Sequence, residues 1–184
     1  MDEPLTFADI AAWESWLDEH HATADGAWLR VRKKNARVPA ITAPEAGDAA
    51  MCFGWIDSHR RGLDADYFLQ RYSRRSPKGT WSQVNVARAG ELIAAGRMRP
   101  AGYAEIEAAR ADGRWQAAYA AQSTAEVPAD VTAALATDPE AAAAFAKLGK
   151  TERYLLVLPV LKAVAPKTRA ARVRKLLDSL RTGG

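Results

Sequence analysis

The sequence is poor in cysteine and in long apolar runs, and each shortage excludes a class of protein. The single cysteine, Cys52, cannot form an intramolecular disulfide and favours a reducing compartment. The apolar stretch from Tyr154 to Leu161 contains a proline and is far shorter than the ~20 residues that a membrane span needs. The first residues, Met1 to Pro4, have neither the basic nor the apolar region of an export signal. We therefore expect a cytoplasmic protein without a membrane span.

The sequence also lacks the patterns of common catalytic sites. The histidines are His20, His21 and His59, and neighbours on a helix point about 100° apart, so we expect no metal site. A glycine-rich phosphate loop and a Gly-x-Ser-x-Gly sequence are both missing, so the sequence predicts no nucleotide cofactor and no serine hydrolase. Cys52 lies in an apolar stretch of a predicted helix, which favours a buried structural thiol over a nucleophile.

The chain has the composition of an ordinary globular domain with a mild excess of positive charge. Its 184 residues are 48% apolar and 26% charged, which suits a single domain with its own core. The net charge is +4, and many of the basic residues fall into three clusters. These clusters are Arg30, Arg32, Lys33, Lys34 and Arg37; then Arg71, Arg74, Arg75 and Lys78; and finally Arg169, Arg172, Arg174 and Lys175.

Hydrophobic periodicity predicts an α+β fold in which a small antiparallel sheet of about three strands packs with several helices. Apolar and polar residues alternate from Trp28 to Lys34, as in a half-buried strand. Two further strands, Trp55 to Arg61 and Tyr67 to Arg74, are separated by a short polar loop and predict a hairpin. The C-terminal half is predicted to be helical.

Capping residues, prolines and glycines place the predicted helices. In the first part of the chain the expected helices are 6–21, 42–54, 80–96 and 100–113. The first has a capping box from Thr6 to Asp9, and Thr80 or Ser82 caps the third. In the second part we expect two short helices starting at Pro128 and Pro139, followed by helices 151–165 and 167–182. Residues 114–127 are predicted to form a surface loop. We expect one domain over 1–184, with a candidate sub-boundary at 114–127 between the sheet-bearing half and the helical half.

The second basic cluster is the best candidate for a ligand site. It directly precedes a predicted helix, whose first N–H groups and positive dipole end favour an anion. Arginines bind carboxylates and phosphates in a bidentate manner, tryptophan rings provide stacking surfaces, and Asp and Asn side chains orient a ligand. The predicted ligand-binding residues are Trp55, Asp57, Arg71, Arg74, Arg75, Lys78, Trp81 and Asn85. The same residues also suit an ion-pair network with both tryptophans in the core.

Three other functions remain open from the residues alone. The three basic clusters together would suit a nucleic-acid-binding protein. However, charge on an edge strand also explains the first cluster, and a solvated helix face explains the third. A module without a pocket could instead dock on a partner through its basic terminal helix. The sequence does not decide whether the protein is an enzyme, and Asp57 is its one acid/base candidate.

Several segments resemble one known family. The segments are Trp13 to His21, Gly26 to Leu29, Cys52 to Asp57, Arg74 and Arg75 with Lys78, Trp81 to Asn85, Gly96 to Gly102, and Ala111 to Trp115. They are similar to the YdeI/OmpD-associated family, and the likeness spans nearly the whole chain. The resemblance implies a role in bacteriocin protection or resistance to antimicrobial peptides. It implies no catalytic residue and no cofactor. Some members of the family are periplasmic.

Overall fold

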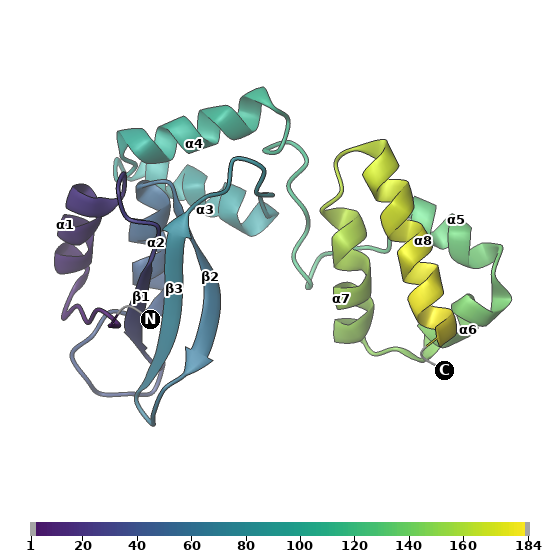
Figure 1. The fold of residues 1–184 in the computed structure, drawn as a ribbon, viewed down its shortest axis with the longest axis horizontal. Coiled ribbons are helices and arrows are strands. Elements are labelled where there is room, and N and C mark those ends of the chain that lie inside the picture. The colour runs from purple at the N-terminus through teal and green to yellow at the C-terminus, as the bar shows by residue number, and fades with distance from the viewer. Residues whose placement is uncertain (1–2, 183–184) are drawn as a thin grey trace. The chain divides into compact units, whose positions relative to one another are not determined.

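The computed structural model describes residues 3–182, so Met1 and Asp2 of the sequence considered for an export signal lie outside the described residues. The chain divides into two compact units (Figure 1). Unit 1 consists of Met1–Gly79 and Ala87–Asp112, and unit 2 of Thr80–Val86 and Gly113–Gly184. The described residues form a three-stranded sheet and eight helices. The predicted α+β fold class is confirmed.

The sheet of unit 1 has the strand order β1–β3–β2 and is antiparallel throughout. Its strands are β1 (Ala27–Arg32), β2 (Trp55–Gly62) and β3 (Tyr67–Arg74), close to the predicted ranges. Leu29 pairs with Gln70 and Val31 with Phe68, so these side chains share the inner face of the sheet. Trp28 pairs with Arg71 and Arg30 with Leu69, which places this second set on the outer face.

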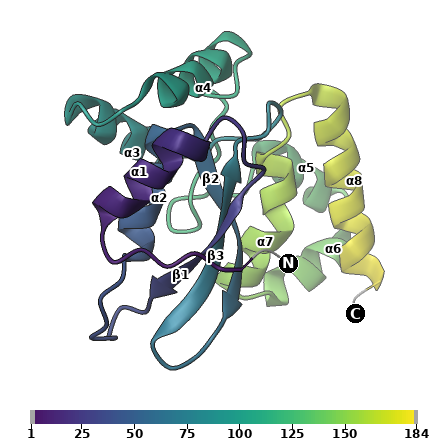
Figure 2. The ribbon, with the colours of Figure 1, turned by 60° about the vertical axis from the view of Figure 1, so that its left-hand side comes forward.

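Four helices complete unit 1: α1 (Ile10–His20), α2 (Ala43–Cys52), most of α3 (Gln83–Ala94) and α4 (Pro100–Ala111). Figures 1 and 2 show α1 and α2 together on one side of the sheet. The core between them contains Trp13, Leu17, Leu29, Val31, Trp55 and Tyr72, each at most 1% exposed. The start of α1 differs from the prediction, because the Asp9 carboxylate caps it by accepting from the Ala12 N–H at 3.0 Å.

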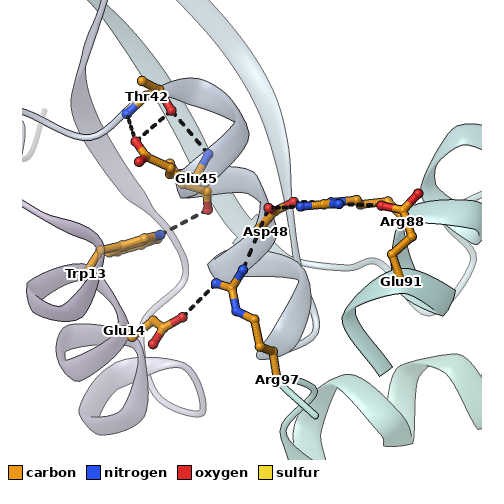
Figure 3. Close-up of polar contacts among 9 residues, drawn as sticks. Trp13, Glu14, Thr42, Glu45, Asp48, Arg88, Glu91 and Arg97 are labelled. Atoms are coloured by element: carbon orange, nitrogen blue, oxygen red, sulfur yellow. Dashed lines mark hydrogen bonds and ion pairs between the residues drawn. The ribbon is translucent and has the colours of Figure 1, made fainter. Parts of the chain in front are cut away.

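Ion pairs connect α1, α2 and α3 within unit 1 (Figure 3). Asp48 on α2 accepts from both the Nε and the Nη2 of Arg88 on α3, and Arg88 also pairs with Glu91. Arg97 lies 2.9 Å from Glu14 on α1 and 3.9 Å from Asp48. The hydrogen bonds that Arg88 donates, above all those to Asp48, raise the pKa of Arg88 above its ordinary value. Both arginines are therefore neutralised within the fold.

Unit 2 contains four C-terminal helices around a separate apolar core. They are α5 (Ala129–Ala136), α6 (Pro139–Lys147), α7 (Lys150–Leu161) and α8 (Pro166–Thr182). Leu176 and Leu180 of α8 pack with Phe145 of α6 and Val157 of α7, so the apolar side of α8 faces this core. Among residues 3–182, no helix is both long enough and apolar enough to cross a membrane.

Two carboxylates link the short helices of unit 2 to α8. Asp130 receives two hydrogen bonds from Arg169, at 2.6 and 2.9 Å. Asp138 caps α6 by accepting from the Ala141 N–H at 3.0 Å and also receives two from Arg181, at 2.9 and 2.5 Å. The Arg169 hydrogen bonds lower the pKa of Asp130, and the Ala141 N–H together with Arg181 lowers the pKa of Asp138.

These lowered pKa values predict that unit 2 loses stability in acid. A depressed folded-state pKa stabilises the fold above the unfolded pKa, ~4, and this contribution disappears as the pH falls through the folded value. We therefore expect Asp130→Asn and Asp138→Asn to lower the melting temperature at pH 7, with a cost of about 0.5–1 kcal/mol for the partly exposed Asp130 pair. Differential scanning calorimetry from pH 7 to pH 3 should show the gap to the wild type closing; a gap independent of pH would contradict it.

Candidate functional site

The two tryptophans predicted as stacking surfaces are buried. Trp55 is 1% exposed at the start of β2, and its Nε1–H donates to the His21 carbonyl at 3.1 Å. Trp81 is 1% exposed in unit 2, with its ring centroid 4.8 Å from that of Trp115. Neither indole offers a face to a ligand in this structure, which corrects the stacking role given to both. Tryptophan has a large apolar surface that suits a core position as well as a stacking surface, so the sequence alone did not distinguish these two roles.

Arg71 and Arg74 converge on the segment that joins α1 to β1. The Arg71 Nη2 donates to the Asp25 carbonyl at 3.3 Å. Arg74 donates to the Ala22 carbonyl at 3.2 Å, and its Nη2 lies 3.4 Å from the Asp25 carboxylate. Glycine is favoured at position 26 beside them, because a Cβ there would lie 2.9 Å from the Tyr72 backbone oxygen, which cannot move aside as a side chain can. Both guanidinium groups therefore fasten this segment to β3, and Arg74 has an acidic partner.

The other predicted site residues occupy different environments. Arg75 is 6% exposed, with its backbone N–H bonded to the Gly54 carbonyl at 3.1 Å. Lys78 is exposed in the turn after β3, and Asp57 is exposed on β2 opposite Tyr72. Asn85 lies in the first turn of α3, where its N–H donates to the Ser82 hydroxyl at 3.2 Å. Trp81 and Asn85 belong to unit 2, and the other six belong to unit 1.

A different set of basic residues surrounds a cavity in unit 1. The cavity has a volume of about 520 Å³ and lies beside the start of α2. Its lining residues are Arg32, Lys33, Lys34, Thr42, Ala43, Pro44, Arg60 and Phe68. Three of its cations come from the first basic cluster and the fourth from β2. The lining contains four cationic side chains and no carboxylate.

Local contacts hold two of these cations in place. The Arg60 guanidinium lies 4.3 Å from the centroid of the Phe68 ring, and its Nε donates to the Gln70 side chain at 2.7 Å. The Lys33 Nζ donates to the Asp64 carbonyl at 2.6 Å. Stacking on the ring and the hydrogen bond through Nε fix the orientation of the guanidinium group. Its terminal nitrogens are therefore preorganised to bind an anion.

The carboxylate nearest the start of α2 is already engaged. Glu45 closes a capping box, in which it accepts from the Thr42 N–H at 2.8 Å and from the Thr42 hydroxyl at 2.7 Å. These Thr42 hydrogen bonds, with a smaller contribution from Arg32, lower the pKa of Glu45. Glu45 therefore stays ionised and bound to the helix cap.

A β-bulge explains why the sequence did not reveal Arg60 as a site residue. Strict alternation from Trp55 would put residues 57, 59 and 61 on the inner face of the sheet. The register shifts between Asp57 and Arg60, so that Arg60 pairs with the inner-facing Gln70 and Arg61 pairs with Leu69 on the outer face. The only sign of this in the sequence was a pair of basic residues, Arg60 and Arg61, that follows a strand start without a clear apolar alternation.

Cys52 is 1% exposed at the end of α2, and burial raises the pKa of its thiol. Because the thiolate is the reactive form, we expect Ellman's reagent to leave Cys52 unmodified in the folded protein at pH 8. Full modification should appear in guanidinium chloride. Rapid modification of the native protein, at the rate of a free thiol, would contradict this prediction.

In residues 3–182 no group of three or more histidine, cysteine, aspartate or glutamate side chains is arranged to hold a metal ion.

Two family models match different parts of the chain. Residues 5–105, more than half of the chain, match the family model described as Domain of unknown function (DUF8412). The chain belongs to this family. Residues 124–183 match a second model, described as Bacteriocin-protection, YdeI or OmpD-Associated. Among the curated proteins and the solved structures, no significant match to the chain is found.

The predicted YdeI/OmpD-associated relationship is confirmed through residues 124–183, which carry the four helices of unit 2. Most of the segments that suggested it, from Trp13 to Gly102, lie instead within the DUF8412 match. The basic cavity is also entirely within the DUF8412 match.

Proposed function

We propose that this DUF8412 protein binds a small anionic ligand in the basic cavity of unit 1. The observation that carries the proposal is the lining, which combines four cations with one aromatic ring and contains no carboxylate. A volume of about 520 Å³ is within the range of small-molecule sites. Arginine and lysine side chains favour phosphate or carboxylate groups, and the Phe68 ring provides an apolar wall.

The proposed role in stress or antimicrobial resistance rests on the description of the family that matches unit 2. The net charge of +4 opposes direct capture of cationic peptides, so the role would act through the anionic ligand. We also propose that the protein is cytoplasmic, as the sequence predicts.

A thermal-shift screen against pyrophosphate, nucleoside monophosphates, sugar phosphates and citrate tests the proposal. A ligand that binds only the folded protein adds ~2.7 kcal/mol of stability when its free concentration is ~100 times Kd. For any anion that raises the melting temperature, the Lys34→Ala/Arg60→Gln variant should weaken binding by at least about tenfold, because two charge-assisted contacts are removed.

Two variants serve as controls in the same screen. Lys167→Ala removes an exposed cation at the start of α8 and should bind like the wild type. Arg74→Gln tests the site predicted at the second basic cluster, and a loss of binding confined to this variant would move the site there. If millimolar concentrations of every anion leave the melting temperature unchanged, the proposal is wrong.

A further inference from the structure

The outer face of the sheet in unit 1 has an unusual composition. The strand register places Trp28 and Arg30 of β1, Leu69 and Arg71 of β3, and Arg61 of β2 on this face. Arg30, Leu69 and Arg61 form one row across the three strands, and Trp28 and Arg71 form the next row. None of these five residues is acidic.

Arg61 reaches across the sheet. Its guanidinium carbon lies 4.9 Å from the centroid of the Trp28 ring, although β1 and β2 are separated by the central strand β3. Arg61 and Arg30 are both exposed residues, whereas Trp28 is partly exposed. The face therefore presents an aromatic ring with a guanidinium group over it, beside the exposed Arg30.

Protection of an exposed edge does not explain this arrangement. Charged residues on an edge strand prevent pairing with another sheet, and β1 and β2 are both edge strands. Arg61, however, lies inward over the face, against the Trp28 ring of the opposite edge strand, rather than away from it. Helices α1 and α2 cover the opposite face, where the buried core of unit 1 lies (Figure 2).

From this geometry we infer that the outer face of the sheet binds single-stranded nucleic acid. Bases stack on aromatic rings and guanidinium planes without regard to their identity, and arginines around them contact the phosphates. Trp28 with Arg61 forms the stacking surface, and the exposed Arg30 supplies a phosphate contact, while Arg71 borders the face with its guanidinium bound to the Asp25 carbonyl. The positive face complements the uniform negative charge of the strand. A duplex hides its bases and is bound more weakly.

The surface is separate from the basic cavity. Trp28, Arg30, Arg61 and Arg71 are absent from the cavity lining, and the cavity residue Arg60 faces the inner side of the sheet with Gln70. Binding of nucleic acid therefore goes beyond the proposed small-ligand site, and either can fail without the other.

Fluorescence anisotropy with a labelled oligo(dT) or oligo(U) of twelve nucleotides tests the inference on the full-length protein. Trp28→Ala should weaken binding by about tenfold or more, because a stacking residue is removed. Trp28→Phe keeps a ring at this position and should retain most of the affinity, which separates stacking from a folding defect. Arg30→Gln should lower the slope of log Kd against log salt concentration by about 0.7 in magnitude.

The matched control is Arg172→Gln on α8, which removes the same charge from an exposed position of unit 2. It should bind within twofold of the wild type. Absence of binding at low salt overturns the inference, as does an equal loss in Arg172→Gln. Equally strong competition by polyglutamate would identify the face as a surface for acidic protein partners and also overturn it.

Discussion

Replacing Trp13 with alanine is expected to lower the free energy of unfolding by about 3–5 kcal/mol, the cost of removing a large aromatic side chain from a core. Trp13 is 0% exposed, and its ring centroid lies 5.3 Å from those of Phe7 and Trp16 and 5.9 Å from that of Tyr72. The loss of the ring leaves a cavity between α1 and the sheet that its neighbours cannot fill. Equilibrium unfolding in urea, followed by circular dichroism, measures the change.

The variant Trp13→Phe separates packing from hydrogen bonding. The Trp13 Nε1–H donates to the Ala46 carbonyl at 3.1 Å, and phenylalanine loses this donor while keeping an aromatic ring. We expect Trp13→Phe to cost about half as much as Trp13→Ala, since it removes one buried hydrogen bond and part of the ring volume. If Trp13→Ala costs less than about 1 kcal/mol, the aromatic cluster is not the centre of the core.

A second large effect is expected for Gly102→Ala in α4. An added Cβ would overlap the backbone oxygen of Cys52 and the Met98 sulfur, and the backbone oxygen has no rotamer with which to move away. The same oxygen accepts from the Arg99 N–H at 3.1 Å, so α4 begins directly against the end of α2. We expect a loss of about 3 kcal/mol and a fall in melting temperature of about 6–12 °C.

Gly90→Ala is the matched control for this substitution. Gly90 is also helical, but a Cβ at this position meets no atom within 4 Å. Alanine there should stabilise the protein by about 0.5–1 kcal/mol, because glycine is a poor helix former. Differential scanning calorimetry of both variants checks the pair of expectations. Equal and small shifts would mean that α4 does not approach α2 as closely as the structure shows.

The sequence was most informative where the physical signal is local. Alternating apolar residues predicted the strands at Trp28 and Tyr67, and the helix predicted from residue 42 is present, with a capping box between Thr42 and Glu45. Helix caps and strand periodicity depend on residues within one or two turns, so a single sequence contains them. The first helix was predicted to be capped by Thr6, whereas Asp9 caps it in the structure. Threonine and aspartate are both favourable N-cap residues, so the sequence does not distinguish the two positions.

The candidate site was harder to predict because it depends on pairing between distant segments. The sequence alone indicated a basic α+β protein, with arginines in clusters, one buried-type cysteine and a resemblance to the YdeI/OmpD-associated family. Only the tertiary structure decided which arginines meet an open cavity and which are used by the fold. A one-residue bulge in β2 sends Arg60 to the inner side and Arg61 to the outer side, and the burial of Trp55 and Trp81 depends on partners far away in the chain. Side-chain direction in a sheet changes with every residue of register, and register is a property of the assembled strands rather than of any one of them.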